Sequence, residues 1–220
     1  GSENHTQPRW SPDGSRIAYV GNQDGKPQLY VRWLGNDREA RLAQLTESPS
    51  SLAWSPDGSR IAFSMFVPAR PQPFVQMPPA PRGAQWADRA AFIDQLVYRR
   101  DGRGYRRPGH THVFVVPADG GAPLQVTRGD FDHGGTVSWT PDGAALVFAA
   151  NRRADADFEP RRQTLYRLEL ATGELTTLLE HEGPVIGPQV SPDGRWIAFR
   201  AFTDREQAYQ QQELWLLSSN

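Results

Sequence analysis

A short turn sequence recurs four times in this chain and limits the folds that it can adopt. In Ser-Pro-Asp-Gly, or Thr-Pro-Asp-Gly, the proline presets the first central turn position and the aspartate suits the second. The glycine then takes a left-handed position without strain. An apolar, alternating segment follows each turn, which predicts four β-hairpins. The turn residues are Pro12, Asp13, Gly14, Pro56, Asp57, Gly58, Pro141, Asp142, Gly143, Pro192, Asp193 and Gly194.

The segments around these turns predict units of four antiparallel strands. Each turn lies between a short strand and an alternating one, and two further apolar segments follow in most units. Four such strands form one blade of a β-propeller. We therefore expect an all-β fold with four blades, at 8–46, 51–127, 135–180 and 186–220, after a lead-in at 1–7 whose Gly1-Ser2 we interpret as a cloning remnant. The last blade shows three strands, so we expect an arc of a larger propeller with open blade edges.

The second blade is expected to carry a long insertion. The motif prolines stand at 12, 56, 141 and 192, and the wide middle interval raises the alternative of a hidden fifth blade. We favour an insertion at 68–109, because strands at 51–66 and 112–127 already complete one blade and the prolines between them disfavour regular sheet. Trp86, Ala90, Ile93 and Val97 have helical spacing, whereas an extended segment at 92–98 is the alternative. A loop of this length is usually functional or disordered.

Composition excludes several classes of function. The net charge is −1, so no global field favours nucleic acid or an acidic membrane. The chain has no cysteine, which excludes disulfides, thiolate nucleophiles and cysteine-based zinc sites. Its apolar runs are too short to span a bilayer. We expect no cofactor, no nucleic-acid partner and no membrane partner, and we expect a cytoplasmic location with the periplasm as the alternative.

A basic and aromatic run in the insertion is the candidate binding feature. It contains Tyr98, Arg99, Arg100, Arg103 and Tyr105. A solvated or locally paired loop is one interpretation. Contact with a neighbouring domain or a peptide carboxylate is another, because a guanidinium grips a carboxylate with two hydrogen bonds. Nucleic-acid stacking is a third, and the near-neutral net charge disfavours it.

Histidines raise the question of a metal or catalytic site. His110 and His112 face the same side of a strand, but no third ligand is near them in sequence, and we interpret them as surface histidines. His133 follows Asp130 and Asp132, and a bridging hydrogen bond is the simpler interpretation than catalysis. We expect no catalytic residue and no metal ligand in this chain.

Two other recurring residue types have structural and functional interpretations. The turn aspartates suit hairpin chemistry better than a shared carboxylate ring. The tryptophans are expected in the core between blades, with a ligand cage as the alternative; they are Trp10, Trp54, Trp139 and Trp196.

The repeat resembles a known class of propellers. Trp54-Ser-Pro-Asp-Gly-Ser-Arg-Ile-Ala-Phe63 resembles the blade signature of TolB-type propellers and of the propellers of prolyl-oligopeptidase-family serine peptidases. Stretches between the turns are similar to the acylaminoacyl-peptidase and dipeptidyl-aminopeptidase-like branch of that family. These stretches lie at 53–68, 98–105, 112–121, 129–133, 149–153 and 171–175.

The resemblance implies a gating role beside a catalytic domain. In that family the propeller covers a C-terminal α/β-hydrolase domain that carries the Ser-His-Asp triad. This sequence has no Gly-x-Ser-x-Gly motif, so we expect no catalysis by the chain alone. The implied partners are a peptide substrate and the hydrolase domain, with self-association through open blade edges as a further possibility. A TolB-like scaffold that binds a protein partner is the alternative function, and two arcs closing one ring is a third hypothesis.

Overall fold

The computed structural model describes residues 4–23, 25–69, 78–84, 93, 95–102 and 104–219, and every regular element in these ranges is a β-strand. Three sheets have four strands, one has three, and one is a two-stranded ribbon. The predicted all-β propeller blades are therefore confirmed, including the incomplete last blade. No helix long and apolar enough to cross a bilayer is found among the described residues.

The four large sheets follow one another along the chain. The first contains β1 (His5–Trp10), β2 (Arg16–Gly21), β3 (Gln28–Trp33) and β4 (Arg38–Arg41). The second contains β5 (Pro49–Trp54), β6 (Arg60–Pro68), β9 (Gly109–Pro117) and β10 (Leu124–Gln125). The third contains β11 (Val137–Trp139), β12 (Ala145–Ala150), β13 (Gln163–Glu169) and β14 (Leu175–His181). The fourth contains β15 (Val185–Val190), β16 (Trp196–Ala201) and β17 (Glu213–Ser218).

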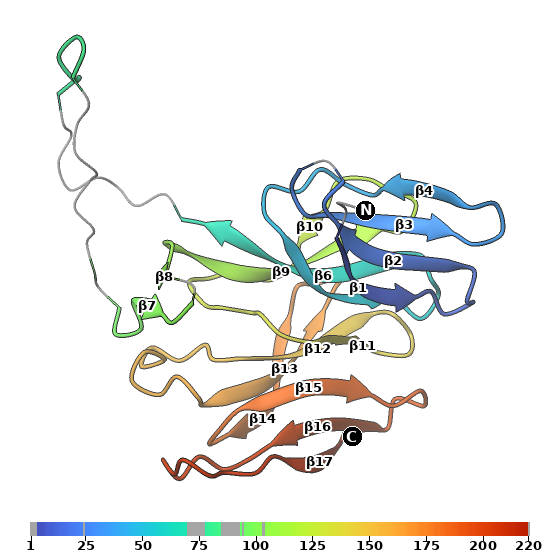
Figure 1. Ribbon diagram of the computed structural model, residues 1–220. Coiled ribbons are helices and arrows are strands. Elements are labelled where there is room, and N and C mark those ends of the chain that lie inside the picture. Colours follow the sequence, from blue (N-terminus) through green and yellow to red (C-terminus); the bar gives the residue numbers. More distant parts are fainter. Residues whose placement is uncertain are drawn as a thin grey trace.

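The sheets stack in sequence order, with the first at the top of Figure 1 and the fourth at the bottom. Because neighbouring strands are antiparallel, successive connections alternate between two ends of each blade. The proline-glycine turns lie at one end, here called the corner end. The insertion and the links between blades lie at the other, here called the insertion end, on the left in Figure 1.

Each proline-glycine turn is held by its own hydrogen bonds. The aspartate Oδ1 accepts a hydrogen bond of 2.5–2.6 Å from the serine or threonine hydroxyl two residues earlier. It also accepts the backbone N–H two residues later, at 3.0–3.1 Å. These bonds lower the pKa of all four carboxyl groups. The glycines have φ between 66° and 72°, the left-handed region that only glycine adopts without strain.

The hydrophobic core lies between the blades. Alternate residues of each blade form a forward face, toward the next blade, and a rear face, toward the preceding one. The forward face of the first blade, with Ala18 and Val31, packs against Phe63 and Val116 on the rear face of the second. The second and third interfaces repeat this arrangement, in two further clusters of buried residues. Strand register therefore decides which residues enter each core.

A repeated polar contact, here called the inter-blade latch, joins the first three blades. Arg16 Nη2 donates to the carbonyl of Gly58 at 2.7 Å, and its guanidinium lies 4.9 Å from the ring centre of Trp54. Trp54 Nε1 donates back to the carbonyl of Arg9 in the first blade, at 3.0 Å. The second interface repeats these distances with Arg60 on Gly143 and Trp139, and with Trp139 Nε1 on Ala53.

The third interface lacks the latch. Ala145 holds the place of the latch arginine at the start of β12, and Val190 holds the place of the tryptophan. Instead, Val190 N–H donates to Ser138 Oγ at 3.0 Å. This interface therefore depends on its apolar cluster and on this backbone-to-serine hydrogen bond.

The two outermost faces of the stack differ in how they are covered. On the rear face of the first blade, Tyr19 and Tyr30 stack at 5.7 Å and are only 7% and 5% exposed. His5 covers Tyr19, and burial, followed by the hydrogen bond with Glu39, raises the pKa of Tyr19 to about 12. Arg32 stands opposite Ile17, where later blades have valine or leucine.

By contrast, the forward face of the fourth blade is bare. Leu214 and Leu216 are 74% and 65% exposed, and Trp196 is 47% exposed. The residues at the matching positions in the second blade, Val113 and Val115, are buried against the third blade. The expectation that all four tryptophans lie between blades is therefore wrong for Trp196, and for Trp10, which is exposed because no arginine from a preceding blade covers it.

Replacing Arg60 with methionine should destabilise the chain by about 2 kcal/mol, because it removes a charge-assisted hydrogen bond and a cation–π contact while keeping the apolar stem. Urea unfolding measures the loss, and the emission of Trp139 should shift to the red. Arg195 pairs with Asp193 in its own turn and, among the described residues, reaches no neighbouring blade, so R195M is the matched control and should change stability by less than about 0.5 kcal/mol. Equal effects of the two variants would contradict the latch.

Candidate functional site: the insertion end and the axial pocket

The insertion leaves and rejoins the second blade at one point. Pro68, the last residue of β6, pairs with Gly109, the first residue of β9. Gly109 has φ of 130°, and a Cβ there would meet the Val67 carbonyl oxygen at 2.3 Å, so this junction requires glycine. The ends of β6 and β9 that carry this junction lie at the insertion end of the stack (Figure 1).

The candidate binding run folds into a small hairpin at the return of the insertion. β7 (Arg99–Arg100) pairs with β8 (Gly104–Tyr105), and the Tyr98 and Tyr105 rings stack at 6.1 Å. Both rings are exposed, at 45% and 64%. Arg99 is also exposed, whereas Arg103 and the side chain of Arg100 lie outside the described residues.

The helix predicted from the spacing of Trp86, Ala90, Ile93 and Val97 falls largely outside the described residues. Trp86 and Ala90 are outside the described residues, and Ile93 and Val97 lie in no regular element.

Two arginines fix the base of this hairpin to the links between blades. Arg106 Nη2 lies 3.0 Å from Asp132 Oδ2, on the link between the second and third blades. Arg107 donates two hydrogen bonds, of 2.8 and 2.9 Å, to Glu47 on the link between the first and second. These bonds with Arg107 lower the pKa of the Glu47 carboxyl. The hairpin is thus held to both links, and its stacked tyrosines are exposed.

A buried histidine pair lies beneath this anchor. His133 is fully buried, and its ring stacks on His112 at 5.2 Å. Arg152 Nη1 lies 2.6 Å from His133 Nε2, so this nitrogen is the acceptor and His133 is neutral. Burial, then the charge of Arg152 and the neighbouring His112, lower the pKa of His133 to about 4.

The histidine expectations are therefore revised. His112 is only 6% exposed and its Nδ1 lies 3.3 Å from Thr127 Oγ1, so the expectation of a surface histidine is wrong for it. His133 is joined to Arg152 rather than to its acidic neighbours. Within the described ranges, no group of three or more histidine and carboxylate side chains is placed to hold a metal ion.

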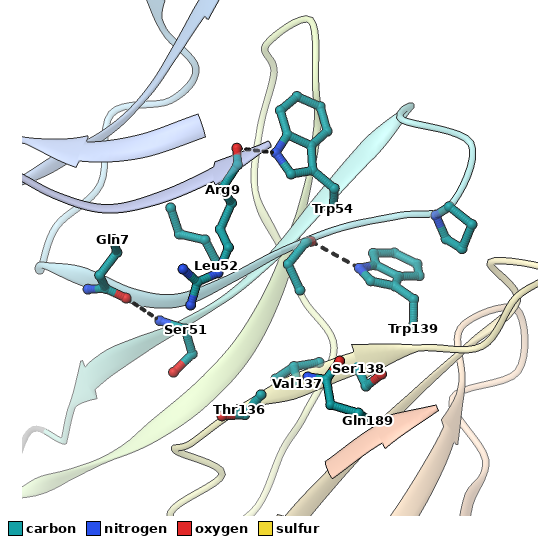
Figure 2. Close-up of a pocket in the computed structure, with 12 residues that line it drawn as sticks. Gln7, Arg9, Ser51, Leu52, Trp54, Thr136, Val137, Ser138, Trp139 and Gln189 are labelled. Carbon is teal, nitrogen blue, oxygen red and sulfur yellow. Dashed lines mark hydrogen bonds between the residues drawn. The ribbon is translucent and has the colours of Figure 1, made fainter. Parts of the chain in front are cut away.

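A pocket on the propeller axis is the feature that the sequence did not reveal. It has a volume of about 390 Å³ and lies along the innermost strands β1, β5 and β11, with Gln189 of β15 at its edge. Figure 2 shows Gln7, Arg9, Ser51 and Gln189 at its wall, with the Trp54 and Trp139 indoles toward the corner end. The signal for it is the polar residues that precede the motif tryptophans.

Titration of His133 should make the chain less stable in mild acid. Its pKa is about 4 in the folded chain and about 6.5 when unfolded, so the unfolded chain takes up the proton first. The stabilisation is complete above about pH 6.5 and is lost as pH falls toward 4. Urea midpoints at pH 7 and pH 5 should therefore differ more for the wild type than for H133Q, which cannot titrate. Parallel pH profiles of the two proteins would contradict this role.

Sequence comparison relates the chain to peptidases. The family described as the dipeptidyl peptidase IV (DPP IV) N-terminal region matches residues 90–199. The uncharacterized peptidase YuxL of Bacillus subtilis is 29% identical over 152 residues, which cover 69% of this chain and 22% of that protein. The chain thus spans about a fifth of the length of this relative.

Structural comparison supports the same fold. The acylaminoacyl peptidase of Pyrococcus horikoshii matches with a TM-score of 0.69 and 16% identity, over 98% of this chain and 31% of that one. TolB of Acinetobacter baumannii matches with a TM-score of 0.62 and 16% identity, over 98% and 41%. The resemblance to the propellers of prolyl-oligopeptidase-family peptidases is confirmed, and the chain belongs to the dipeptidyl peptidase IV N-terminal region family.

Proposed function

We propose that this chain is the gating propeller of a cytoplasmic serine oligopeptidase that cleaves short peptides or acyl-amino acids. The observation that carries the proposal is the insertion hairpin, which is anchored by Arg106 and Arg107 to two blade links and exposes the stacked rings of Tyr98 and Tyr105. Blade architecture does not require this segment. Its position at one end of the stack suits contact with a further domain or with an arriving peptide.

The division of labour follows from what the residues can do. Cleavage by acyl transfer needs a serine nucleophile, a histidine base and an oriented carboxylate, which a C-terminal α/β-hydrolase domain supplies in this proposal. His112 and His133 do not offer such a base, because they are buried against each other. This chain restricts which substrates reach that domain, and its stacked tyrosines offer apolar surface to an extended peptide.

The purified chain should therefore show no turnover of an acetyl-alanyl anilide and no labelling by a fluorophosphonate. The natural polypeptide containing it should do both. In that polypeptide, Y98A combined with Y105A should raise KM for a peptide substrate by about fivefold or more, through lost aromatic contacts, and leave kcat/KM for a small ester unchanged. Tyr209 is 80% exposed in the β16–β17 loop at the same end, so Y209A is the matched control. Turnover by the chain alone, or equal effects of both variants, would contradict the gate.

A protein-binding scaffold is the second candidate function. It is supported by the structural similarity to TolB and by the bare forward face of the fourth blade. A natural gene without a hydrolase segment would favour the scaffold, and a Gly-x-Ser-x-Gly motif downstream would exclude it.

The bare forward face also supports self-association. Leu214 and Leu216 occupy positions that the next blade covers in the other three sheets. Closure of a ring by two arcs would place this face against the rear face of a first blade, where Arg32 and its pairing with Asp37 would have to be desolvated. Pairing of two forward faces avoids this cost, and we propose it for the isolated chain.

L216E should weaken this association by more than tenfold, because each copy loses about 1.5–3 kcal/mol of leucine burial. Light scattering across a concentration series measures it. Leu124 is 63% exposed on β10, away from this face, so L124E should associate like the wild type. A wild-type chain that stays monomeric at high concentration would overturn the proposal.

A further inference from the structure

The axial pocket has a one-sided chemistry. Arg9 is the charged residue of its wall, and no carboxylate is among the described residues that line it. Gln7, Ser51 and Gln189 bring amide and hydroxyl groups to the same wall. Leu52 and the two indoles supply apolar surface. A groove with one fixed cation, several hydrogen-bonding groups and an apolar floor is complementary to an extended chain that bears a carboxylate.

The backbone of the wall is built to present these side chains. β1 and β5 each contain a bulge, where the register shifts between Thr6 and Arg9 and between Ser50 and Ala53. The residues inside the bulges, Gln7 and Ser51, both have φ of 55°, an unfavourable conformation for residues other than glycine.

The fourth blade shows that glycine can occupy the equivalent bulge position, so the bulge itself requires no side chain there. Its shift between Ile186 and Gln189 contains Gly187, with φ of 63°, where the conformation is unstrained. The first two blades therefore accept strain at a position that can be glycine. Bulges of this kind re-aim side chains next to functional sites.

The two strained residues also support each other across a blade interface. Gln7 Oε1 accepts the backbone N–H of Ser51 at 2.8 Å (Figure 2). This bond fixes the amide plane of Gln7, and its amide nitrogen can then donate to a ligand carbonyl. Arg9 Nη1 donates to the Pro8 carbonyl at 2.9 Å, a contact that leaves further guanidinium N–H groups for an anion.

We propose that the axial pocket binds the carboxylate of an extended peptide, with Arg9 as its ion-pairing residue and Gln7, Ser51 and Gln189 as hydrogen-bonding partners of the peptide backbone. The carboxylate can be the C-terminus or an acidic side chain. This inference goes beyond the proposed gating role, because binding is expected of the isolated chain and needs no hydrolase domain.

The test titrates isotope-labelled chain with three probes and follows the indole N–H resonances of Trp54 and Trp139. The probes are acetyl-trialanine with a free carboxylate, its carboxamide, and acetyl-Ala-Glu-Ala carboxamide. The free acid should bind about tenfold or more tightly than its amide, as expected for a charge-assisted contact. If the glutamate peptide binds as well as the free acid, the site reads an acidic side chain; if it binds like the plain amide, the site reads the C-terminus.

Variants separate this site from general charge. R9Q should weaken binding of the favoured probe by about tenfold or more and remove its salt dependence. R38Q, on the exposed outer strand β4, should bind like the wild type. S51G keeps the bulge and relieves its strain, so it should raise the urea midpoint while weakening binding.

Three results would overturn the proposal. They are binding of both carboxylate probes no tighter than that of the acetyl-trialanine carboxamide, equal effects of R9Q and R38Q, and the absence of binding at millimolar probe. None of them bears on whether the natural polypeptide hydrolyses peptides, so the gating proposal stands or falls separately.

Discussion

The contact on which the arrangement depends is the latch between an arginine of one blade and the tryptophan and glycine of the next. A single four-stranded sheet has two apolar faces and cannot bury both by itself. The latch sets the angle and height at which the next sheet covers the forward face, because the guanidinium meets a flat indole and one fixed carbonyl together. The proline-glycine turn has two roles in this scheme: it closes its own hairpin, and its glycine carbonyl receives the arginine of the preceding blade.

Loss of the latch at the third interface changes what holds the fourth blade. Because this interface has neither the latch arginine nor the latch tryptophan, the fourth blade is joined by its apolar cluster and by the hydrogen bond from Val190 N–H to Ser138. Its forward face then carries Trp196 where earlier blades carry arginine or alanine. The rear face of the first blade is polar and covered by its own residues, whereas this forward face is apolar and bare. The stack is therefore directional: its two outermost faces, the rear face of the first blade and the forward face of the fourth, do not suit the same partner.

The sequence predicted the fold because each turn motif fixes the strands on both sides of it. Register followed from alternation, and the insertion followed from the wide spacing between Pro56 and Pro141. The contents of the site were harder to predict. Burial of His112 depends on the link that brings His133 beside it from outside its own blade, and sequence spacing carries no information about that approach. The bulges at Gln7 and Ser51 also escaped prediction, because glycine marks this conformation at Gly187 and is absent from the first two blades.

The strained bulges connect the architecture to function. The latch fixes how β1 and β5 approach, since Trp54 Nε1 donates to the Arg9 carbonyl, and this places Gln7 within hydrogen-bonding distance of the Ser51 amide. The interaction that orders the blades therefore also shapes the axial pocket. The insertion is anchored independently, through Glu47 and Asp132 on the links. The two proposals place peptide selection at two sites: at aromatic surface on the insertion end, and at the Arg9 charge along the axis. Because the two sets of residues share no contact among those described, each can change without loss of the other.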